Sequence, residues 1–386
     1  MKAAQLIQAA RANGTPLYVY DATFLRERAR TLRSLVLPGG ATFRYAAKAN
    51  THPTIIKIFH EEGLHFDASS SYEAWELIKV GVPARHVSLS SQQPAHNLAE
   101  LLTAGVRYVA TSLHQLQTFC ASPAKTATVA LRVNAGLGAG GTNRTTTGGT
   151  ASSFGLWHEY LDQALATAAE AGVVIDRLHM HIGSGADPAV WGQAMDVALG
   201  IVTRMPQVTT LDIGGGYKVH RYGDEQETDM QAVASVFSEK LLAYAAKTGR
   251  QLHLEIEPGT WLVAHAGVLL AEIIDIVDTG KAGFNFLRLN TGMNDILRPS
   301  LYGAQHKIDV LNDSTAKERY VVVGHNCESG DILTPEKGNP EVIEPRLLKQ
   351  AAIGDVVAIY DVGAYCASMS TKGYNAFPQT PELFLN

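Results

Sequence analysis

The sequence has little cysteine and no long apolar run. Only three cysteines occur in 386 residues, Cys120, Cys327 and Cys366, and an odd number at unrelated spacings argues against a disulfide framework and a cysteine zinc site. No apolar stretch reaches the roughly 20 residues of a membrane helix, and the first residues lack the features of a signal peptide. We therefore expect no metal centre, no membrane contact and a reducing, cytoplasmic setting.

A surplus of positive charge is also missing. The chain carries 32 Lys and Arg against 37 Asp and Glu, a formal net charge of -5, so nothing favours nucleic acid or an anionic membrane as a partner. Hydrophobic residues make up 46%, as in globular proteins. Because 386 residues exceed one ordinary core, we expect two domains that act on a small molecule.

Short β-rich runs alternate with amphipathic segments in the first two thirds of the chain. Segments such as Pro53–Glu62 and Asp229–Lys247 are long enough for helical crossovers between parallel strands. Eight such units predict an α/β fold with a (β/α)8 barrel over residues 22–264. The strand runs are Thr42–Ala47, His65–Asp67, Val87–Ser91, Tyr108–Ser112, Val129–Asn134, Leu178–Ile182, Leu211–Ile213 and Leu254–Glu257.

The pattern changes after the expected barrel, where β-rich runs follow one another without helices. These runs predict a C-terminal β-domain over residues 265–386, and residues 1–21 join it if the strand-like Leu17–Tyr20 pairs with it. The irregular stretch Gly136–Ser153 is expected to form a loop over the barrel mouth. The runs are Gly267–Asp278, Phe284–Asn290, Tyr320–Gly324 and Asp355–Asp361.

Polar residues follow six of the eight expected strands. A barrel has its active site at the carboxyl ends of its strands. An open doubly wound sheet would show the same alternation, but without chemistry after nearly every strand. The residues at these ends are Lys48, Asp67, Asn134, His181 with Ser184, the triplet Gly214, Gly215 and Gly216, and Glu257.

Two of these features have both a chemical and an ordinary interpretation. An ammonium in the mouth, as at Lys48, tends to lose its proton and can then attack a carbonyl, although a lone strand-end lysine more often reaches solvent. The glycine triplet at residues 214–216 could expose amides to a phosphate or form only a tight turn. Ser184 and Gly259, after neighbouring strands, favour the phosphate.

The other candidate residues also have two interpretations each. The carboxylate of Glu257 needs a partner, either a protonated pyridine nitrogen or a buried cation. His181 could stack on a flat cofactor or be an ordinary core histidine. In the second domain, Cys327 could deliver a proton, and Arg298 with Tyr302 could hold a carboxylate. An inert thiol and a surface ion pair are the alternatives there.

Seven motifs, in the same order, resemble those of the fold-type III PLP decarboxylases, the ornithine, arginine and diaminopimelate decarboxylase family. The resemblance spans nearly the whole chain and implies an alanine-racemase-like barrel. The motifs are YAAKAN, FDASSSYE, HMHIGSG, LDIGGGY, EIEPG, CESGD and GAYCASMSTKGYN.

The resemblance implies pyridoxal 5'-phosphate (PLP) as the cofactor and a site shared across a homodimer. Lys48 would hold PLP as a Schiff base, Glu257 would face the pyridine nitrogen, and Cys327 of the partner subunit would protonate the α-carbon. The implied cofactor contacts are Asp67, His181, Ser184, Gly214, Gly215, Gly216, Pro258, Gly259, Thr260 and Tyr365.

Within the family, LRPSLYGAQH and CESGD are similar to the diaminopimelate-specific members. The similarity implies decarboxylation of meso-2,6-diaminopimelate at its D-centre to L-lysine and CO2. The implied contacts to the distal end of the substrate are Arg298, Tyr302, Glu328 and Tyr365. One departure is Thr260, where the family usually has an arginine.

Three rival functions remain at this level. A decarboxylase of another basic or D-amino acid, or of a siderophore precursor, would share the site without a carboxylate for Arg298. A racemase of the same fold typically carries an arginine at the pyridine nitrogen, where this chain has Glu257. A non-catalytic or regulatory PLP-binding homologue would be expected to lack Lys48 or Cys327.

Overall fold

The computed structural model of the chain describes residues 1–138 and 147–386, so the expected loop Gly136–Ser153 lies partly outside the described residues. The chain forms two compact units. Residues 219–225 group with the β-unit, although the expected barrel range of 22–264 contains them. The barrel unit comprises Arg26–Lys218 and Gln226–Leu262, and the β-unit comprises Met1–Leu25, Val219–Glu225 and Val263–Asn386.

The barrel unit is a closed parallel barrel. Its strands run in the order β5-β4-β3-β2-β10-β9-β8-β6, the pairing of β5 with β6 closes the ring, and the short β7 (Leu156–Trp157) adds to β6. The predicted barrel is therefore confirmed. The ring is formed by β2 (Ala41–Ala46), β3 (His65–Ala68), β4 (Val87–Leu89), β5 (Arg107–Ala110), β6 (Thr128–Asn134), β8 (Val174–His179), β9 (Thr210–Asp212) and β10 (His253–Ile256).

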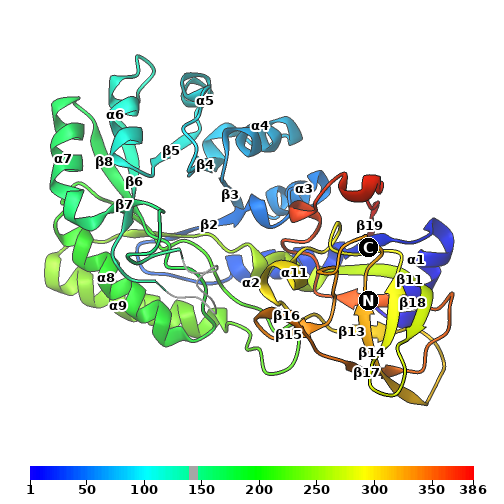
Figure 1. The fold of residues 1–386 in the computed structure, drawn as a ribbon. Helices are drawn as coiled ribbons and strands as arrows, with labels where there is room; N and C mark the ends of the chain where they lie inside the picture. The colour runs from blue at the N-terminus through cyan, green and yellow to red at the C-terminus, as the bar shows by residue number, and fades with distance from the viewer. Residues whose placement is uncertain (139–146) are drawn as a thin grey trace. The chain divides into compact units, whose positions relative to one another are not determined.

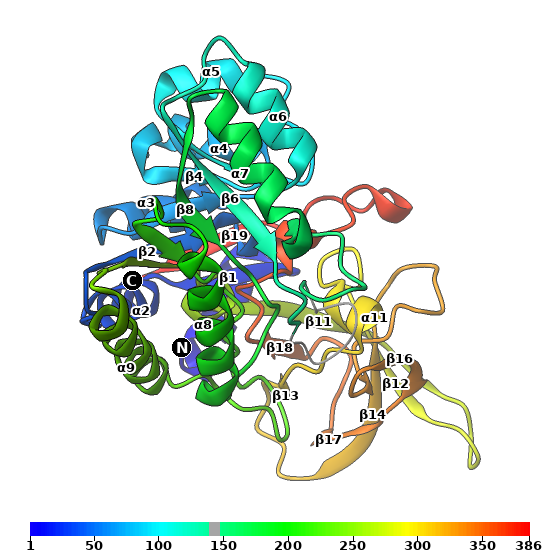
Figure 2. The ribbon, with the colours of Figure 1, turned by 90° about the vertical axis from the view of Figure 1, so that its left-hand side faces the viewer.

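Helices follow the barrel strands and are bounded by local signals (Figure 1). Ser70 caps α4 by accepting the amide of Glu73 at 3.1 Å, and Gly81 ends it in the left-handed region. Helices α8 and α9 lie side by side (Figure 2). The helices are α2 (Ala22–Arg33), α3 (Pro53–Glu61), α4 (Ser71–Val80), α5 (Leu98–Ala104), α6 (Leu113–Ala121), α7 (Leu161–Glu170), α8 (Pro188–Thr203), α9 (Met230–Thr248) and α10 (Thr260–Val263).

The β-unit is built on an eight-stranded sheet in which β13-β18-β11-β12-β14-β17 are neighbours. The first and last strands of the chain join it, because β1 pairs with β11 and with β19. The expected pairing of Leu17–Tyr20 is confirmed. The strands are β1 (Leu17–Asp21), β11 (Gly267–Asp278), β12 (Asn285–Leu289), β13 (Ile308–Val310), β14 (Lys317–Val323), β17 (Arg346–Lys349), β18 (Val356–Tyr360) and β19 (Glu382–Leu385), with β15 (Pro335–Glu336) and β16 (Asn339–Ile343) as a separate pair.

Among the described residues, two α-helices lie wholly within the β-unit. The N-terminal α1 (Ala3–Asn13) buries Leu6 against Val19 and Leu270 of the sheet. A short helix, α11 (Arg298–Tyr302), corrects the expectation of a domain without helices; Pro299 at its first turn suits a helix start. Among the described residues, no helix is both long and apolar enough to cross a membrane.

Candidate active site

The carboxyl ends of four neighbouring barrel strands are joined by backbone hydrogen bonds. The amide of Gly185, after β8, donates to Gly216 at 3.1 Å, and that of Glu257, after β10, donates to Gly214 at 2.8 Å. On the other side of β10, Ala46 of β2 donates to Pro258 at 3.2 Å. The loops after β8, β9, β10 and β2 thus form one continuous rim, and it carries most of the residues predicted for the cofactor.

The glycine triplet is required by close backbone packing. A Cβ on Gly215 would lie 2.0 Å from the carbonyl oxygen of Glu257, and one on Gly216 would lie 1.8 Å from that of Gly183. The amide of Gly214 donates to Asp212 at 2.9 Å and that of Gly215 to Nδ1 of His181 at 3.2 Å. Of the three amides expected to be exposed, only that of Gly216 has no hydrogen bond to the described residues.

Glu257 is a buried acid in a strongly charged environment. Its Oε2 lies 3.4 Å from Nε2 of His179, and its Oε1 lies 3.8 Å from a guanidinium nitrogen of Arg177. Burial, followed by the charge of Asp212, raises the pKa of Glu257 well above its usual range. Its Oε1 is buried without a hydrogen-bond partner in the described part of the chain.

Buried charges of alternating sign continue below Glu257 in the barrel. Arg177 bonds to Asp212 and lies 2.8 Å from Glu255, which in turn accepts a bidentate pair from Arg44 at 2.9 and 3.0 Å. Burial opposes ionisation of Asp212, but Arg177 and the hydrogen bond to Glu257 hold its pKa well below the usual value. Protonated Glu257 therefore donates to ionised Asp212.

The same cluster has the spacing of a metal site, because one ligand atom each from His179, Asp212 and Glu257 lies within 4.8 Å of the others. The guanidinium of Arg177 already contacts Asp212 and Glu257 and balances the charge of ionised Asp212. A divalent cation would have to displace this guanidinium. The arrangement therefore suits a shared proton better than a metal ion.

Lys48 lies just beyond β2, in the single turn Ala47–Ala49, and its side chain is exposed rather than buried. It nevertheless lies near enough to the carboxyl groups of Asp67 and Glu257 to lower their pKa values. Asp67, at the end of β3, is buried and accepts a hydrogen bond from Ser90 at 3.1 Å. Burial, followed by Glu257, raises the pKa of Asp67 to about 7. The structure therefore brings Lys48, Asp67 and Glu257 into one electrostatic environment.

His181 is held in one orientation over the rim. Its Nδ1 accepts the amide of Gly215, and burial, followed by Arg132 and Lys48, lowers its pKa well below the usual value. The ring is therefore neutral, with its proton on Nε2. Ser184 lies in the same loop, two residues after Ile182. Thr260 is the first residue of α10 and follows Gly259 directly.

The second group of predicted residues lies in the β-unit. Arg298 and Tyr302 lie on α11, with the guanidinium 5.9 Å from the centre of the phenol ring. Ser300 of the same helix donates to the carbonyl of Gly330 at 2.8 Å. This bond places α11 against the CESGD segment, residues 327–331.

The CESGD segment is anchored by its last residue. Asp331 accepts the amide of Asn326 at 2.8 Å and that of Met293 at 2.6 Å. Cys327 and Glu328 are exposed, and the amide of Gly330 and the hydroxyl of Tyr374 lower the pKa of Glu328. The segment thus presents a thiol and a carboxylate on a fixed turn.

Tyr365 follows β18 with a φ of 57°, a left-handed conformation that is uncommon for a large residue. It is half-buried, and neighbouring Cys366 is fully buried. Such a conformation persists only where the surrounding structure requires it.

Sequence reasoning missed the barrel-lining charges Arg44, Arg132, Arg177, Asp212 and Glu255. Their signal was present, because Arg132 and Asn134, Arg177 and His179, and Glu255 and Glu257 are polar residues two apart in otherwise apolar strands. Positions two apart on a strand share a face. In a closed barrel this face is the interior.

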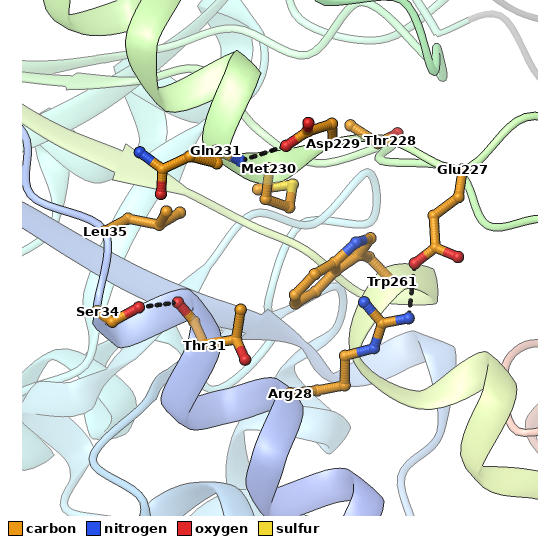
Figure 3. A pocket seen from close by; sticks show the side chains of 10 residues that line it. All are labelled: Arg28, Thr31, Ser34, Leu35, Glu227, Thr228, Asp229, Met230, Gln231 and Trp261. Carbon is orange, nitrogen blue, oxygen red and sulfur yellow. Dashed lines mark hydrogen bonds and ion pairs between the residues drawn. The ribbon is translucent and has the colours of Figure 1, made fainter.

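A separate hollow of about 380 Å³ lies on the outer wall of the barrel unit. In Figure 3, Arg28 pairs with Glu227 at 2.6 Å and its guanidinium lies 4.3 Å from the centre of the Trp261 ring. None of the predicted site residues lines it, so it is not part of the barrel mouth.

The residues of the barrel mouth fit a flat, anionic, nitrogen-containing cofactor. The unpartnered Oε1 of Glu257 can accept a ring N–H, and the amide of Gly216, which has no hydrogen bond to the described residues, can donate to a phosphate. A neutral imidazole at His181 offers a flat face beside them. Lys48 supplies an amine for covalent attachment.

Comparison with known proteins agrees with this chemistry. Residues 24–264 match the family described as pyridoxal-dependent decarboxylase, pyridoxal binding domain. The diaminopimelate decarboxylase of Streptomyces coelicolor is 33% identical over 401 residues, covering 99% of this chain and 87% of that protein.

Solved structures are similar over the whole length. A diaminopimelate decarboxylase crystal structure has a TM-score of 0.91 and 29% identity, covering 100% of this chain and 91% of that one. The Helicobacter pylori diaminopimelate decarboxylase complexed with L-lysine has a TM-score of 0.86 and 25% identity, covering 98% and 94%. The chain therefore belongs to the family of pyridoxal-dependent decarboxylases, in the group that includes the diaminopimelate decarboxylases.

Proposed function

We propose that the chain decarboxylates meso-2,6-diaminopimelate at its D-centre, with PLP on Lys48, and releases L-lysine and CO2. The observation that carries the proposal is the buried acid Glu257, with its unpartnered Oε1, in a chain of this family. An acid keeps a ring nitrogen protonated, and a protonated ring stabilises the carbanion that loss of CO2 leaves behind. The ring of a racemase of this fold stabilises such a carbanion less. The similarity to curated diaminopimelate decarboxylases supports the choice of substrate.

The barrel residues would bind and orient the cofactor. When bound, PLP supplies an electron sink for the charge that remains on the α-carbon after CO2 leaves. Lys48 would attach it, Glu257 would hold a proton at its ring nitrogen and His181 would lie against its ring. The phosphate would meet the rim, through Ser184, Gly214, Gly215, Gly216, Pro258, Gly259 and Thr260, with Asp67 and Tyr365 as further contacts.

The residues of the β-unit would bind the substrate and complete the reaction. Arg298 and Tyr302 hold the distal carboxylate, while ionised Glu328, with Tyr365, faces the distal ammonium group. After the bond between the α-carbon and the carboxylate has broken and CO2 has left, Cys327 would transfer its proton to the α-carbon and become a thiolate. Exposure of Cys327 and Glu328 supports their presentation to a partner subunit in a homodimer, which we propose to be cytoplasmic.

The substrate is tested by CO2 release from the purified holoenzyme with meso-diaminopimelate, L-lysine, D-lysine and ornithine. We expect release from meso-diaminopimelate at a rate at least roughly 100-fold above the others, because only it offers both a D-centre and a distal carboxylate. Release from D-lysine or ornithine alone would replace the substrate assignment.

Attachment of the cofactor is tested with Lys48→Ala. The variant is expected to lose both turnover and the near-ultraviolet or visible absorbance of covalently held PLP, because no other residue is assigned to hold the aldehyde carbon. Lys57→Ala, on the helix that follows, is the matched control. A Lys48→Ala protein with full turnover would contradict the assignment.

A further inference from the structure

The loop that contains Arg221 belongs to the β-unit although it leaves the barrel strand β9. The ring of Tyr222 lies 3.9 Å from the guanidinium carbon of Arg346, Asp224 pairs with Lys337, and Nε of Arg221 donates to the carbonyl of Asp361 at 3.4 Å. These contacts fix the loop on the β-unit. They also bring the Arg221 guanidinium into its interior.

Arg221 is buried without a matching carboxylate. It is only 7% exposed, its Nη2 has no hydrogen-bond partner among the described residues, and no described ion pair includes it. The nearest acids are engaged elsewhere, since Asp361 bonds to His265 at 2.6 Å and Glu225 accepts the backbone amide of Arg221 at 2.9 Å. A buried cation left in this state is costly.

The groups around Arg221 carry charge of both signs, because Glu225 and Asp361 act against the effect of Arg298. Burial and the neighbouring Arg298 lower the pKa of Arg221 to about 10. His306 is 1% exposed, and burial, followed by Arg298, Arg221 and Arg346, lowers its pKa well below the usual value. Burial raises the pKa of the Cys366 thiol to about 11, so that thiol stays neutral as well.

The orientation of His306 agrees with a neutral ring. Its Nδ1 lies 2.8 Å from the carbonyl of Tyr360 and must carry the proton, because a carbonyl oxygen only accepts. Three guanidinium groups, those of Arg221, Arg298 and Arg346, therefore lie near enough to this neutral imidazole to lower its pKa. None of the three forms an ion pair within the part of the chain that the structure describes.

We propose that Arg221 acts with Arg298 as a second guanidinium that binds the non-reacting carboxylate of the substrate. This inference rests on the proposed function, because it assigns the recognition of that distal carboxylate. A planar guanidinium presents paired N–H donors that match the two oxygens of a carboxylate, and two such groups can share one anion. Arg221 is then a residue that determines specificity.

The test compares two ligands of the holoenzyme that differ only by this carboxylate, L-lysine and cadaverine. Inhibition constants are measured for the wild type, Arg221→Met and Arg298→Met. We expect Arg221→Met to raise the inhibition constant of L-lysine roughly 10- to 100-fold, as for loss of a charge-assisted hydrogen bond. The inhibition constant of cadaverine should change by less than about twofold. Arg298→Met should behave in the same way.

Two controls separate binding from folding. Arg288→Met removes an exposed arginine of β12 that pairs with Asp275 at 2.9 Å, and it should leave both constants unchanged. If Arg221→Met does not retain bound PLP, Arg221→Lys takes its place. This variant keeps the positive charge but loses the paired N–H donors of the guanidinium. We expect the inhibition constant to rise several-fold for L-lysine alone.

The outcomes distinguish the two proposals. A wild type that releases CO2 from meso-diaminopimelate and prefers L-lysine, combined with an Arg221 variant of unchanged preference, would overturn this inference alone. A wild type with no preference between L-lysine and cadaverine and no CO2 release would overturn the proposed function. Equal weakening of both ligands by Arg221→Met would assign Arg221 a structural role and also overturn the inference.

Discussion

At the scale of single residues, the environment of Glu257 determines what the barrel mouth can do. Asp212 is ionised because Arg177 stabilises it, and the resulting negative charge, together with burial, keeps a proton on Glu257. Arg177 is fully buried and also contacts Glu255. The proton on Glu257 is therefore maintained by a chain of charges that reaches through the barrel.

Replacing Glu257 tests this role directly. Glu257→Gln keeps the size of the side chain but cannot exchange a proton with a ring nitrogen, and we expect kcat for CO2 release to fall by roughly 100-fold or more, while PLP stays attached. Glu76→Gln, at an exposed position of α4, should have no effect. A Glu257→Gln enzyme within threefold of the wild type would contradict the role of the acid.

At the scale of elements, the glycine turn after β9 allows a prediction based on sterics alone. Gly215 does not have a positive φ, so the effect of Gly215→Ala comes from the Cβ that would meet the carbonyl of Glu257 at 2.0 Å. The change should displace the Glu257 backbone, weaken PLP binding by roughly tenfold or more and lower the melting temperature. Fluorescence titration with PLP measures the first effect and calorimetry the second.

Gly200→Ala is the matched control, because Gly200 lies within α8 and a Cβ there would meet nothing within 4 Å. This variant should bind PLP as the wild type does and melt slightly higher, since alanine favours a helix. Equal behaviour of Gly215→Ala and Gly200→Ala would show that the turn tolerates a side chain and would remove the steric argument.

Most elements could be predicted from the sequence, because short apolar runs separated by polar helices identify buried parallel strands. Helix α8 carries its buried residues, such as Trp191, Met195 and Val202, along one face, as expected for a crossover that packs on barrel strands. The partners of the Gly214 and Gly215 amides, Asp212 and His181, depend on loop geometry that no local pattern contains.

The candidate site was predictable to a similar extent. Residues at strand ends, such as Lys48 and Glu257, follow from the barrel rule. Arg177 and Arg221 do not, because one lies within a strand and the other in a loop that packs on a different unit. Such residues are identified only when the tertiary structure shows which charges are buried together.

The amino ends of β3 and β4 give a prediction for pH dependence. The rings of His65 and His86 stack with centroids 4.1 Å apart, and burial, followed by Arg44, lowers the pKa of His65 to about 4. Above pH 6.5 the ring is neutral in both states. Between pH 6.5 and 4 the unfolded chain gains a proton that the folded chain does not, so stability falls as the pH falls.

The variant His65→Phe retains the stack but cannot be protonated. Between pH 7.5 and pH 5, the melting temperature of the wild type should fall further than that of the variant. The corresponding difference in the free energy of unfolding is at most about 2 kcal/mol, because solvent partly screens the half-buried ring. His114→Phe, at an exposed position on α6, is the control. Parallel pH profiles for wild type and His65→Phe would mean that His65 is readily protonated in the folded protein.

At the scale of the whole molecule, the division of labour between the units leads to a prediction about subunits. Lys48 and Glu257 belong to the barrel unit, whereas Cys327, Glu328 and Arg298 belong to the β-unit. If each site combines Lys48 of one subunit with Cys327 of the other, two inactive variants can restore each other. A dimer of Lys48→Ala with Cys327→Ala then holds one site with both natural residues and one with neither.

Co-expression of the two variants with different affinity tags yields this mixed dimer in pure form. Its CO2 release should reach about half of the wild-type value per dimer, because one of two sites is intact, while each variant alone should stay near background. Co-expression of Lys48→Ala with Glu257→Gln is the control, since both changes lie in the barrel unit and no site of that mixed dimer keeps both residues. Activity near background in the Lys48→Ala and Cys327→Ala dimer would place both residues in a site made by one chain.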